Sequence, residues 1–383
     1  METTSVLHVI KTKSFDSDVR LLKWVSSLAN HNITSDILVL EDKNEAGKYT
    51  VDGTGIQALS LTARKYFKQR KGYLLKIPEY SLKVLRFIKR SPHKILVFHD
   101  SQHYLTLWYV CLFKPFKKKI IWDLHELPHP ILSKFAVTKS AVKFILNNVD
   151  LVIYTNKERR DCVLKMFPFN EKKYVILNNY PDDDFITAAL APIAQEVKAN
   201  TAGLPYVLWM GNATYTRNFF PVLRTLVNFK DKIKLVVMGS VEPALQKYIT
   251  EQGLDDFVFS KFVSQAEIMS YVDNAMFSIV LYKQSSLNNT YCEPNRLYQL
   301  IARHIPVIAG NNPTMKDVLE KYGAGIVLPD DGSDESALLT AVNEMMLPGT
   351  RERIRAALNA LDFQQIFSWE HQFEGVYKQI TSL

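Results

Sequence analysis

Short apolar runs rich in valine and isoleucine recur along the whole chain, and each is bounded by polar residues, glycine or asparagine. The runs are continuously apolar instead of alternating between apolar and polar positions, which is typical of strands buried on both faces of a sheet. We therefore predict about twelve buried strands. The runs are 6–10, 36–40, 94–99, 119–124, 151–155, 174–179, 206–211, 234–240, 257–262, 277–282, 305–310 and 324–328.

Segments with apolar residues spaced three and four apart lie between these runs and predict amphipathic helices. The clearest are 19–29, 81–90, 267–272 and 335–346. The mostly apolar stretch 104–116 lies between two predicted strands, and we interpret it as a core helix instead of a membrane helix. Because strands and helices alternate throughout, the sequence predicts parallel sheets with helices on both faces.

The number of strands and one change of composition predict the domain organisation. About twelve strands exceed what one twisted sheet holds comfortably, and 383 residues exceed the usual size of one hydrophobic core. Residues 181–205 are acidic, alanine-rich and bounded by proline, as expected of a connection, and we expect 181–184 to form a solvated turn. The expected fold class is α/β, with two doubly wound Rossmann-like domains at 1–185 and 186–365.

The formal net charge of +8 is unevenly distributed, because fifteen lysine and arginine residues and only two acidic residues lie between 63 and 119. Solvated helix faces explain any single one of these charges. The cluster as a whole is interleaved with aromatic and leucine residues, and it suits contact with an anionic membrane surface or a phosphorylated lipid. No nucleic-acid-binding module accompanies the charge, so we do not expect nucleic acid as a partner.

Cysteine usage and the lack of targeting segments bear on the compartment. Cys111, Cys162 and Cys292 are scattered and odd in number, which fits reduced thiols. No run reaches the roughly 18 to 20 apolar residues of a membrane-spanning helix, and the first residues lack the apolar core of a signal peptide. We expect a cytoplasmic protein with peripheral contact at the inner face of the membrane.

The stretch WDLHELPHP contains His125-Glu126-x-x-His129, the spelling of many zinc proteases. Such a site needs both histidines on one face of a continuous helix. Pro128 lies between the histidines and Pro130 follows them, and a proline inside a helix costs about 3 kcal/mol. The sequence therefore predicts a strand followed by a turn, and no metal site.

Three polar residues of this stretch lie at the carboxyl end of a predicted parallel strand. Open α/β sheets bind their ligands at this edge, so Asp123, His125 and Glu126 are candidate site residues. The alternative interpretation is an ordinary turn histidine followed by a glutamate at a helix start.

Two further groups of candidate residues follow strands in the second half. Gly211 ends a strand and Arg217 lies near the start of the next helix, an arrangement that offers backbone N–H groups and positive charge to a phosphate. Glu293 precedes a helix that begins near Asn295 and Arg296. Two ligand-facing turns in one domain suit a phosphorylated donor bound in a cleft.

These segments resemble GT-B glycosyltransferases, in particular the retaining family-4-like group. In that group a Pro-Asn-Lys/Arg-Leu-aromatic-Glu helix precedes Gly-x-Pro-Val-Ile-Ala, and PNRLYQLIARHIPVIAG (294–310) is similar to it. Matching segments occur in the family's order at 14–29, 119–128 and 367–380. The resemblance spans nearly the whole chain, and it implies two domains that face each other across a cleft, with a closing helix at 366–383 that packs back on the first domain.

The resemblance implies a nucleotide-diphosphate sugar as donor, no separate cofactor, and a glycan or lipid-linked acceptor, as in bacterial-type surface polysaccharide assembly. It places the donor diphosphate and ribose among residues of the second domain. These donor-binding residues are Gly211, Asn212, Arg217, Lys261, Asn295, Arg296 and Gln299.

The resemblance also implies which residues meet the reacting groups. Glu293 would contact the transferred sugar, and His125 would touch the donor sugar or the departing phosphate. Glu126 or Asp123 would orient His125 or the acceptor hydroxyl.

Three positions depart from the family pattern. Gln299 stands where the family has a glutamate that holds the ribose, and an amide can still bond to hydroxyl groups. His304 replaces the usual glycine. Asn212 replaces the basic residue expected after Gly211, so neutralisation of the phosphates must depend more on Arg217.

We expect a metal-independent, retaining enzyme, in which cationic side chains and a helix N-terminus stabilise the leaving diphosphate. Two alternatives stay open: a nucleotide-sugar epimerase or hydrolase on the same scaffold, and a catalytically silent subunit that binds a partner enzyme or a glycan. Sugar release that needs an added acceptor excludes the first, and donor binding without turnover indicates the second. Fold resemblance cannot separate them, because function depends on the site.

Overall fold

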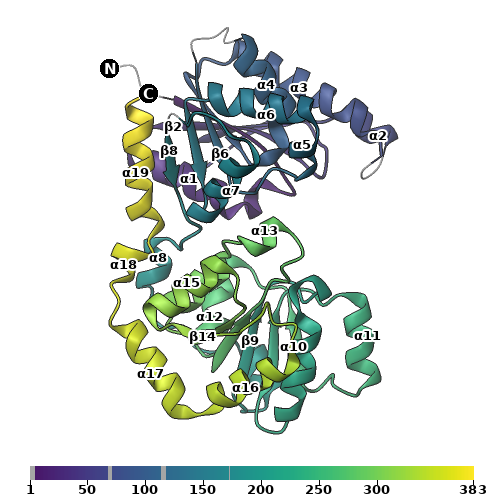
Figure 1. Cartoon of the computed structure of the whole chain (residues 1–383), viewed down its shortest axis with the longest axis vertical. Coiled ribbons are helices and arrows are strands. Elements are labelled where there is room, and N and C mark those ends of the chain that lie inside the picture. The colour runs from purple at the N-terminus through teal and green to yellow at the C-terminus, as the bar shows by residue number, and fades with distance from the viewer. Residues whose placement is uncertain (1–4, 68–70, 114–117, 172) are drawn as a thin grey trace. The chain divides into compact units, whose positions relative to one another are not determined.

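The chain divides into two compact units, drawn in Figure 1. Unit 1 comprises Met1–Asn178 and Trp369–Leu383, and unit 2 comprises Asn179–Ser368. The acidic, alanine-rich segment 181–205, within which the sequence analysis places the domain boundary, therefore belongs to unit 2. The computed structural model describes residues 5–67, 71–113, 118–171 and 173–383.

Unit 1 is built on an eight-stranded sheet with the strand order β3-β4-β2-β1-β5-β6-β7-β8. All neighbouring pairs are parallel except β3 with β4, so the predicted parallel sheet is confirmed for the rest. Strand β1 lies between β2 and β5, and the strand order reverses at this point. The strands are β1 Ser5–Thr12, β2 Thr34–Glu41, β3 Gly47–Val51, β4 Thr54–Ala58, β5 Ile95–His99, β6 Lys119–Leu124, β7 Leu151–Tyr154 and β8 Tyr174–Ile176.

The antiparallel hairpin of β3 and β4 was not expected from the sequence. Asp52 and Gly53 form its two-residue turn, and both have positive φ values, 47° and 79°. An Asp-Gly pair between strands is a strong hairpin signal, because both central positions of the favoured turn need a left-handed backbone. The signal was present, but the strands beside it are mostly polar and short, unlike the buried runs elsewhere.

Helices cover both faces of this sheet, as predicted (Figure 1). On one face α1 packs with α19, and Trp24 and Trp369 from these helices join a core cluster with side chains of β1 and β5. On the other face α4 packs between α3 and α6. The helices are α1 Val19–Asn30, α2 Thr62–Tyr66, α3 Tyr73–Arg90, α4 Tyr104–Phe113, α5 Ile131–Lys134, α6 Ala136–Asn148, α7 Lys157–Met166 and α19 Trp369–Thr381, with the 3-10 turns η1 Phe15–Ser17 and η2 Ser101–His103.

Unit 2 is built on a six-stranded, wholly parallel sheet with the order β11-β10-β9-β12-β13-β14. Its strand order reverses between β9 and β12. The largest apolar core cluster of the described residues surrounds this sheet. The strands are β9 Tyr206–Met210, β10 Lys234–Met238, β11 Val258–Lys261, β12 Phe277–Val280, β13 Val307–Ala309 and β14 Gly325–Val327.

The helices of unit 2 include two in the segment that was expected to be a plain connection. Its acidic run 181–184 is not a solvated turn: Asp182 accepts a hydrogen bond from the Phe185 N–H and caps α8. Aspartate is favoured at this position because it satisfies an otherwise unpaired helical N–H. The helices are α8 Asp183–Thr187, α9 Gln195–Thr201, α10 Phe219–Leu226, α11 Pro243–Glu251, α12 Ile268–Val272, α13 Leu287–Thr290, α14 Asn295–Ala302, α15 Pro313–Tyr322, α16 Glu335–Met346, α17 Pro348–Asn359 and α18 Phe363–Ile366, with the 3-10 turns η3 Tyr215–Arg217, η4 Val227–Phe229 and η5 Gln265–Glu267.

Candidate functional site

The point where the strand order reverses in unit 2 brings several predicted residues together. Gly211 directly follows β9, and Tyr282 lies just beyond the end of β12. The carboxyl ends of two strands that diverge to opposite sides of a sheet leave a crevice, which is the usual ligand site of open α/β sheets. Arg217 ends the turn η3 after β9, and Arg296 lies in the first turn of α14.

Gly211 is the point on which two arginine side chains converge. Its φ of +94° is a conformation that suits glycine, and a Cβ atom at this position would lie 2.7 Å from Nη1 of Arg217 and 3.2 Å from Nη1 of Arg296. The missing side chain therefore makes room for two guanidinium groups beside the end of β9. Two cations this close repel each other, so the arrangement favours an anion between or above them.

The side chain of Arg296 is buried and is held in place by its neighbours. Its side chain is 8% exposed, its Nη1 donates to the Met210 carbonyl, and its guanidinium lies 4.6 Å from the centre of the Tyr282 ring. Burial lowers the pKa of Arg296, and the neighbouring Arg217 lowers it further. No carboxylate among the described residues forms an ion pair with either arginine. A phosphate group would supply the missing negative charge.

Asn212 positions the loop of this site. Its carbonyl accepts from Arg217 Nη1 at 3.5 Å, and its side-chain Oδ1 accepts from the Ser240 N–H at 3.3 Å. The turn after β10 approaches so closely that a Cβ on Gly239 would lie 2.6 Å from the Gly211 carbonyl carbon. The Asn212 side chain thus joins two neighbouring βα turns. It brings no positive charge to the site, unlike the basic side chain that the family pattern has here.

The start of α14 brings Glu293 and Asn295 to the same end of the sheet. Glu293 is 5% exposed and bonds to the hydroxyl of Tyr298. Burial, followed by the charge of Glu293, raises the pKa of Tyr298 well above its usual value, so Tyr298 stays a neutral donor to this carboxylate. Asn295 and Gln299 are half-buried and one turn apart, so they share one face of the helix.

Lys261 lies at the end of β11, which is separated from β9 by β10. Its ammonium forms an ion pair with Glu196 of α9, and the Tyr271 hydroxyl donates to the same carboxylate oxygen at 2.5 Å. The hydrogen bond from Lys261 lowers the pKa of Glu196 to about 2. Lys261 can therefore reach a ligand only if it leaves Glu196, in contrast to the two arginines beside Gly211.

In unit 1 the segment 125–129 is not helical, because β6 ends at Leu124 and α5 begins only at Ile131. The two histidines of the protease-like spelling therefore do not share a helix face. His129 instead accepts a hydrogen bond from the Ile131 N–H at 3.2 Å.

Asp123, at the end of β6, is fully buried and bonded on both carboxylate oxygens. Arg20 donates to it twice, at 2.7 and 3.0 Å, and Trp24 Nε1 donates at 3.1 Å. Nδ1 of His99 lies 3.0 Å from Asp123 Oδ2, and Nε2 of His99 lies 2.9 Å from Nδ1 of His8. Burial alone would raise the pKa of Asp123, but Arg20 and His99 outweigh it and hold the pKa well below its usual range. Asp123 therefore fixes the strand ends and does not reach a ligand directly.

Asp100 is a site residue that the sequence analysis missed. It follows β5 directly, its backbone has a φ of +69°, and its Oδ1 lies 3.9 Å from Nε2 of His125. This Oδ1 is buried and has no hydrogen-bond partner among the described residues. Strained backbone conformations at the end of a strand are often found at functional sites. A polar residue directly after the run 94–99 was the available signal.

His125 and Glu126 lie beside Asp100. The His125 carbonyl accepts a hydrogen bond from Arg159, which fixes the backbone after β6. Partial burial and the nearby Asp100 carboxylate raise the pKa of Glu126. The His125 imidazole and the carboxyl groups of Asp100 and Glu126 therefore lie near one another after the strands β5 and β6.

Comparison with known proteins bears on the fold. No protein-family profile and no curated protein sequence matches the chain. Among solved structures, a sucrose-phosphate synthase from Thermosynechococcus elongatus is 14% identical with a TM-score of 0.72, and the alignment covers 99% of both chains. A glycosyltransferase from Rickettsia africae ESF-5 is 13% identical with a TM-score of 0.71, covering 100% of this chain and 99% of its own.

An E. coli structure described as trehalose-6-phosphate bound with UDP-2-fluoro glucose is 11% identical with a TM-score of 0.71, over 99% of both chains. At these identities the likeness establishes the architecture alone. The chain has the GT-B fold, with two Rossmann-like domains, and it is similar in structure to glycosyltransferases that use nucleotide sugars.

Proposed function

We propose that the protein is a glycosyltransferase that moves a sugar from a nucleotide-diphosphate donor to a glycan or lipid-linked acceptor, with retention of configuration and without a metal ion. The observation that carries the proposal is the convergence of Arg217 and Arg296 on Gly211, at the point where the strand order of unit 2 reverses. Two arginines without a carboxylate partner suit a diphosphate. The similar E. coli structure with its bound UDP-sugar supports the same conclusion.

The proposed chemistry depends on these cations. As the bond between the sugar and the diphosphate breaks, negative charge develops on the leaving oxygen, and Arg217 and Arg296 stabilise it. The start of α14 at Asn295 adds a positive helix end, and Gln299 on the same face bonds to the ribose. Glu293, kept in place by Tyr298, contacts a hydroxyl of the transferred sugar.

Unit 1 contributes the acceptor side in this proposal. His125 contacts the donor sugar or the departing phosphate, Glu126 orients the acceptor hydroxyl, and Asp100 fixes the His125 ring through its facing carboxylate. Asp123 acts as a positioning residue, because its two oxygens are occupied by Arg20, Trp24 and His99.

The donor site is tested by thermal unfolding in the presence of UDP-, GDP-, ADP- and CMP-sugars. We expect one nucleotide class to raise the melting temperature of the wild-type protein, and Arg217→Ala to lose most of that shift, since a charged hydrogen bond contributes about 1.5 to 3 kcal/mol. Arg224→Ala is the matched control, because Arg224 is an exposed arginine on α10 that pairs with Glu335.

Two outcomes would contradict the donor site. If no nucleotide sugar stabilises the protein, the assignment is wrong, and if Arg217→Ala and Arg224→Ala respond alike, the ligand binds elsewhere. Stabilisation without sugar transfer to any acceptor would favour the silent-subunit alternative. That alternative is motivated by Gln299 and His304, which depart from the family pattern.

We also propose a cytoplasmic location in bacterial-type surface polysaccharide assembly, with peripheral contact between the basic stretch 63–119 and an anionic membrane. Exposed apolar side chains support the contact: Tyr66 is 77% and Leu74 90% exposed. Among the described residues, no helix has the length and apolar character to span a membrane. Four of the basic residues, Lys68, Arg70, Lys114 and Lys117, lie outside the described residues.

A further inference from the structure

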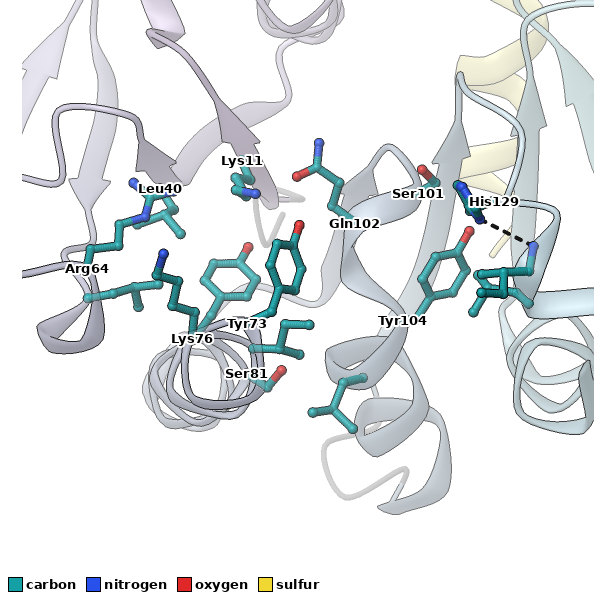
Figure 2. Close-up of a pocket in the computed structure, with 16 residues that line it drawn as sticks. Lys11, Leu40, Arg64, Tyr73, Lys76, Ser81, Ser101, Gln102, Tyr104 and His129 are labelled. Atoms are coloured by element: carbon teal, nitrogen blue, oxygen red, sulfur yellow. Dashed lines mark hydrogen bonds between the residues drawn. The ribbon is translucent and has the colours of Figure 1, made fainter. Parts of the chain in front are cut away.

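A cavity of about 430 Å³ lies where the strand order of unit 1 reverses (Figure 2). Lys11 near the end of β1 and Leu40 near the end of β2 line it, together with Ser101 and Gln102 after β5. Ser101 directly follows Asp100, so the cavity is adjacent to the candidate acceptor side. Its position is the one at which an open α/β sheet binds ligands.

Three cationic side chains, Lys11, Arg64 and Lys76, gather on one side of this cavity (Figure 2). Burial lowers the pKa of Lys11, and Arg64 and Lys76 lower it further, against a partial opposing effect of Asp42 and Asp100. The Lys11 ammonium has no hydrogen-bond or ion-pair partner among the described residues. Among the described residues, no acidic side chain lines the cavity. This concentration of positive charge suits a phosphate group.

An apolar groove of about 950 Å³ along α4 and α6 lies next to the cavity. Tyr104, Leu105 and Leu132 line both the cavity and the groove, so the two hollows share one wall. Val137 and Leu112 in the groove are 81% and 45% exposed. Exposed apolar side chains gathered in a groove mark an interaction site in a globular protein.

We propose that the cavity and the groove together bind one amphiphile, with its phosphate head among Lys11, Arg64 and Lys76 and its apolar chain along α4 and α6. The charges are confined to the cavity and the groove is apolar, which matches the two ends of such a molecule. The inference rests on the proposed function only in regarding this amphiphile as the acceptor; the binding itself is independent of sugar transfer. With that assumption, the proposal restricts the chemical class of the acceptor from a glycan or lipid-linked molecule to a lipid phosphate.

Trp108 in the groove supplies a local probe of the apolar chain. The described residues include all five tryptophans, and Trp24, Trp122, Trp209 and Trp369 are at most 1% exposed, whereas Trp108 is partly exposed. A bromine-labelled chain that enters the groove therefore quenches the fluorescence of Trp108 selectively. In Trp108→Phe the same probe should produce little quenching.

The experiment uses the full-length protein and three soluble probes below their micelle concentrations. These are a brominated monoacylglycerol phosphate, the corresponding brominated monoacylglycerol without phosphate, and glycerol phosphate without a chain. We expect saturable quenching by the first probe, binding at least about tenfold weaker for the second, and weak competition by the third, because head and chain each contribute.

Two variants test the two ends of the site. Lys76→Gln should weaken binding of the brominated lipid phosphate by about tenfold or more, whereas Lys89→Gln, an exposed position on the same helix that does not line the cavity, should leave it unchanged. Val137→Glu places a charge in the groove at an exposed position and should reduce the quenching. Retained melting temperatures confirm that the variants are folded.

Three outcomes would overturn the inference. Absence of Trp108 quenching excludes the groove, equal binding of the phosphate-free probe excludes the cationic cavity, and glycerol phosphate binding as tightly as the lipid phosphate indicates a small phosphorylated ligand. Thermal stabilisation by nucleotide sugars should be unchanged in Lys76→Gln. Loss of the lipid site and loss of the donor site are therefore separate results.

Discussion

At the scale of single residues, two departures from the family pattern have different physical meanings. Asn212 lowers the positive charge of the proposed donor site, because a neutral amide that accepts a hydrogen bond from the Ser240 N–H stands where a cation was expected. His304 affects the backbone at the end of a helix and adds ring contacts with Phe363 and Asn359. It has a φ of +58° just after α14, and the Ile305 N–H donates to the Leu300 carbonyl at 3.0 Å, as in a helix ended by a left-handed residue.

The strain at His304 leads to a stability prediction. His304→Gly and His304→Ala both remove the ring, which stacks on Phe363 with centroids 5.5 Å apart, but only glycine relieves the left-handed backbone. We expect His304→Gly to be more stable than His304→Ala by about 1 kcal/mol. Chemical denaturation, monitored by the tryptophan fluorescence of unit 2, measures the difference in the free energy of unfolding. Equal stability of the two variants would contradict the proposed backbone strain at this position.

The candidate residues differ in how far the sequence reveals them. Gly211 and Arg217 could be predicted because a strand followed by glycine and then a cation is a local pattern. Asp100 was not predicted, because it stands out only by its distance to His125 and by its positive φ. Neither property can be inferred from the neighbouring residues in the sequence. The pairing of Lys261 with Glu196 joins residues 65 positions apart, and no local pattern predicts it.

At the scale of elements, α19 completes unit 1 from the far end of the sequence. Trp369 is fully buried, and its Nε1 donates to Ser27 Oγ on α1 at 2.9 Å. Trp24 meets Phe373 edge to face with ring centroids 5.1 Å apart. The buried side chains of α19 therefore close one face of the sheet that α1 covers only partly.

We expect Trp369→Ala to destabilise unit 1 by about 3 to 5 kcal/mol, because it leaves a large cavity and an unpaired Ser27 hydroxyl. Lys378→Ala on the exposed side of the same helix is the control and should change stability by less than about 0.5 kcal/mol. Hydrogen exchange should show the loss of protection in β1 and β5 and not in β9 and β12. A uniform loss across both units would contradict this division.

The strands that could be predicted are those whose residues form a continuous apolar run. The continuous apolar runs correspond to twelve of the fourteen strands of the described residues, and the two that were missed, β3 and β4, form the partly exposed edge hairpin. The stretch 104–116 contains the helix α4 at Tyr104–Phe113, as interpreted from its position between strands. In β4, buried and half-buried positions alternate, so it forms no continuous apolar run, and the hairpin is signalled only by the Asp52-Gly53 turn.

At the scale of the whole molecule, the uneven charge leads to a prediction about membranes. We expect the protein to sediment with vesicles that contain phosphatidylserine and not with pure phosphatidylcholine, and we expect high salt to weaken the binding because exposed charges are screened. The double variant Arg86→Glu and Arg90→Glu on α3 should bind less. The matched double variant Lys230→Glu and Lys247→Glu in unit 2 should bind as wild type.

Equal sedimentation with both kinds of vesicle would remove the membrane proposal. It would not contradict the proposed lipid-phosphate site in unit 1, because the test of that site uses single amphiphiles in solution and no vesicles.

Because unit 1 is assembled from Met1–Asn178 and Trp369–Leu383, it cannot complete its folding before all of unit 2 has been synthesised. The first segment is synthesised before α19, which covers part of one face of its sheet, whereas the uninterrupted Asn179–Ser368 can fold on its own. A nascent chain stalled before Trp369 would therefore expose apolar surface to chaperones, and synthesis of α19 would allow that surface to be covered.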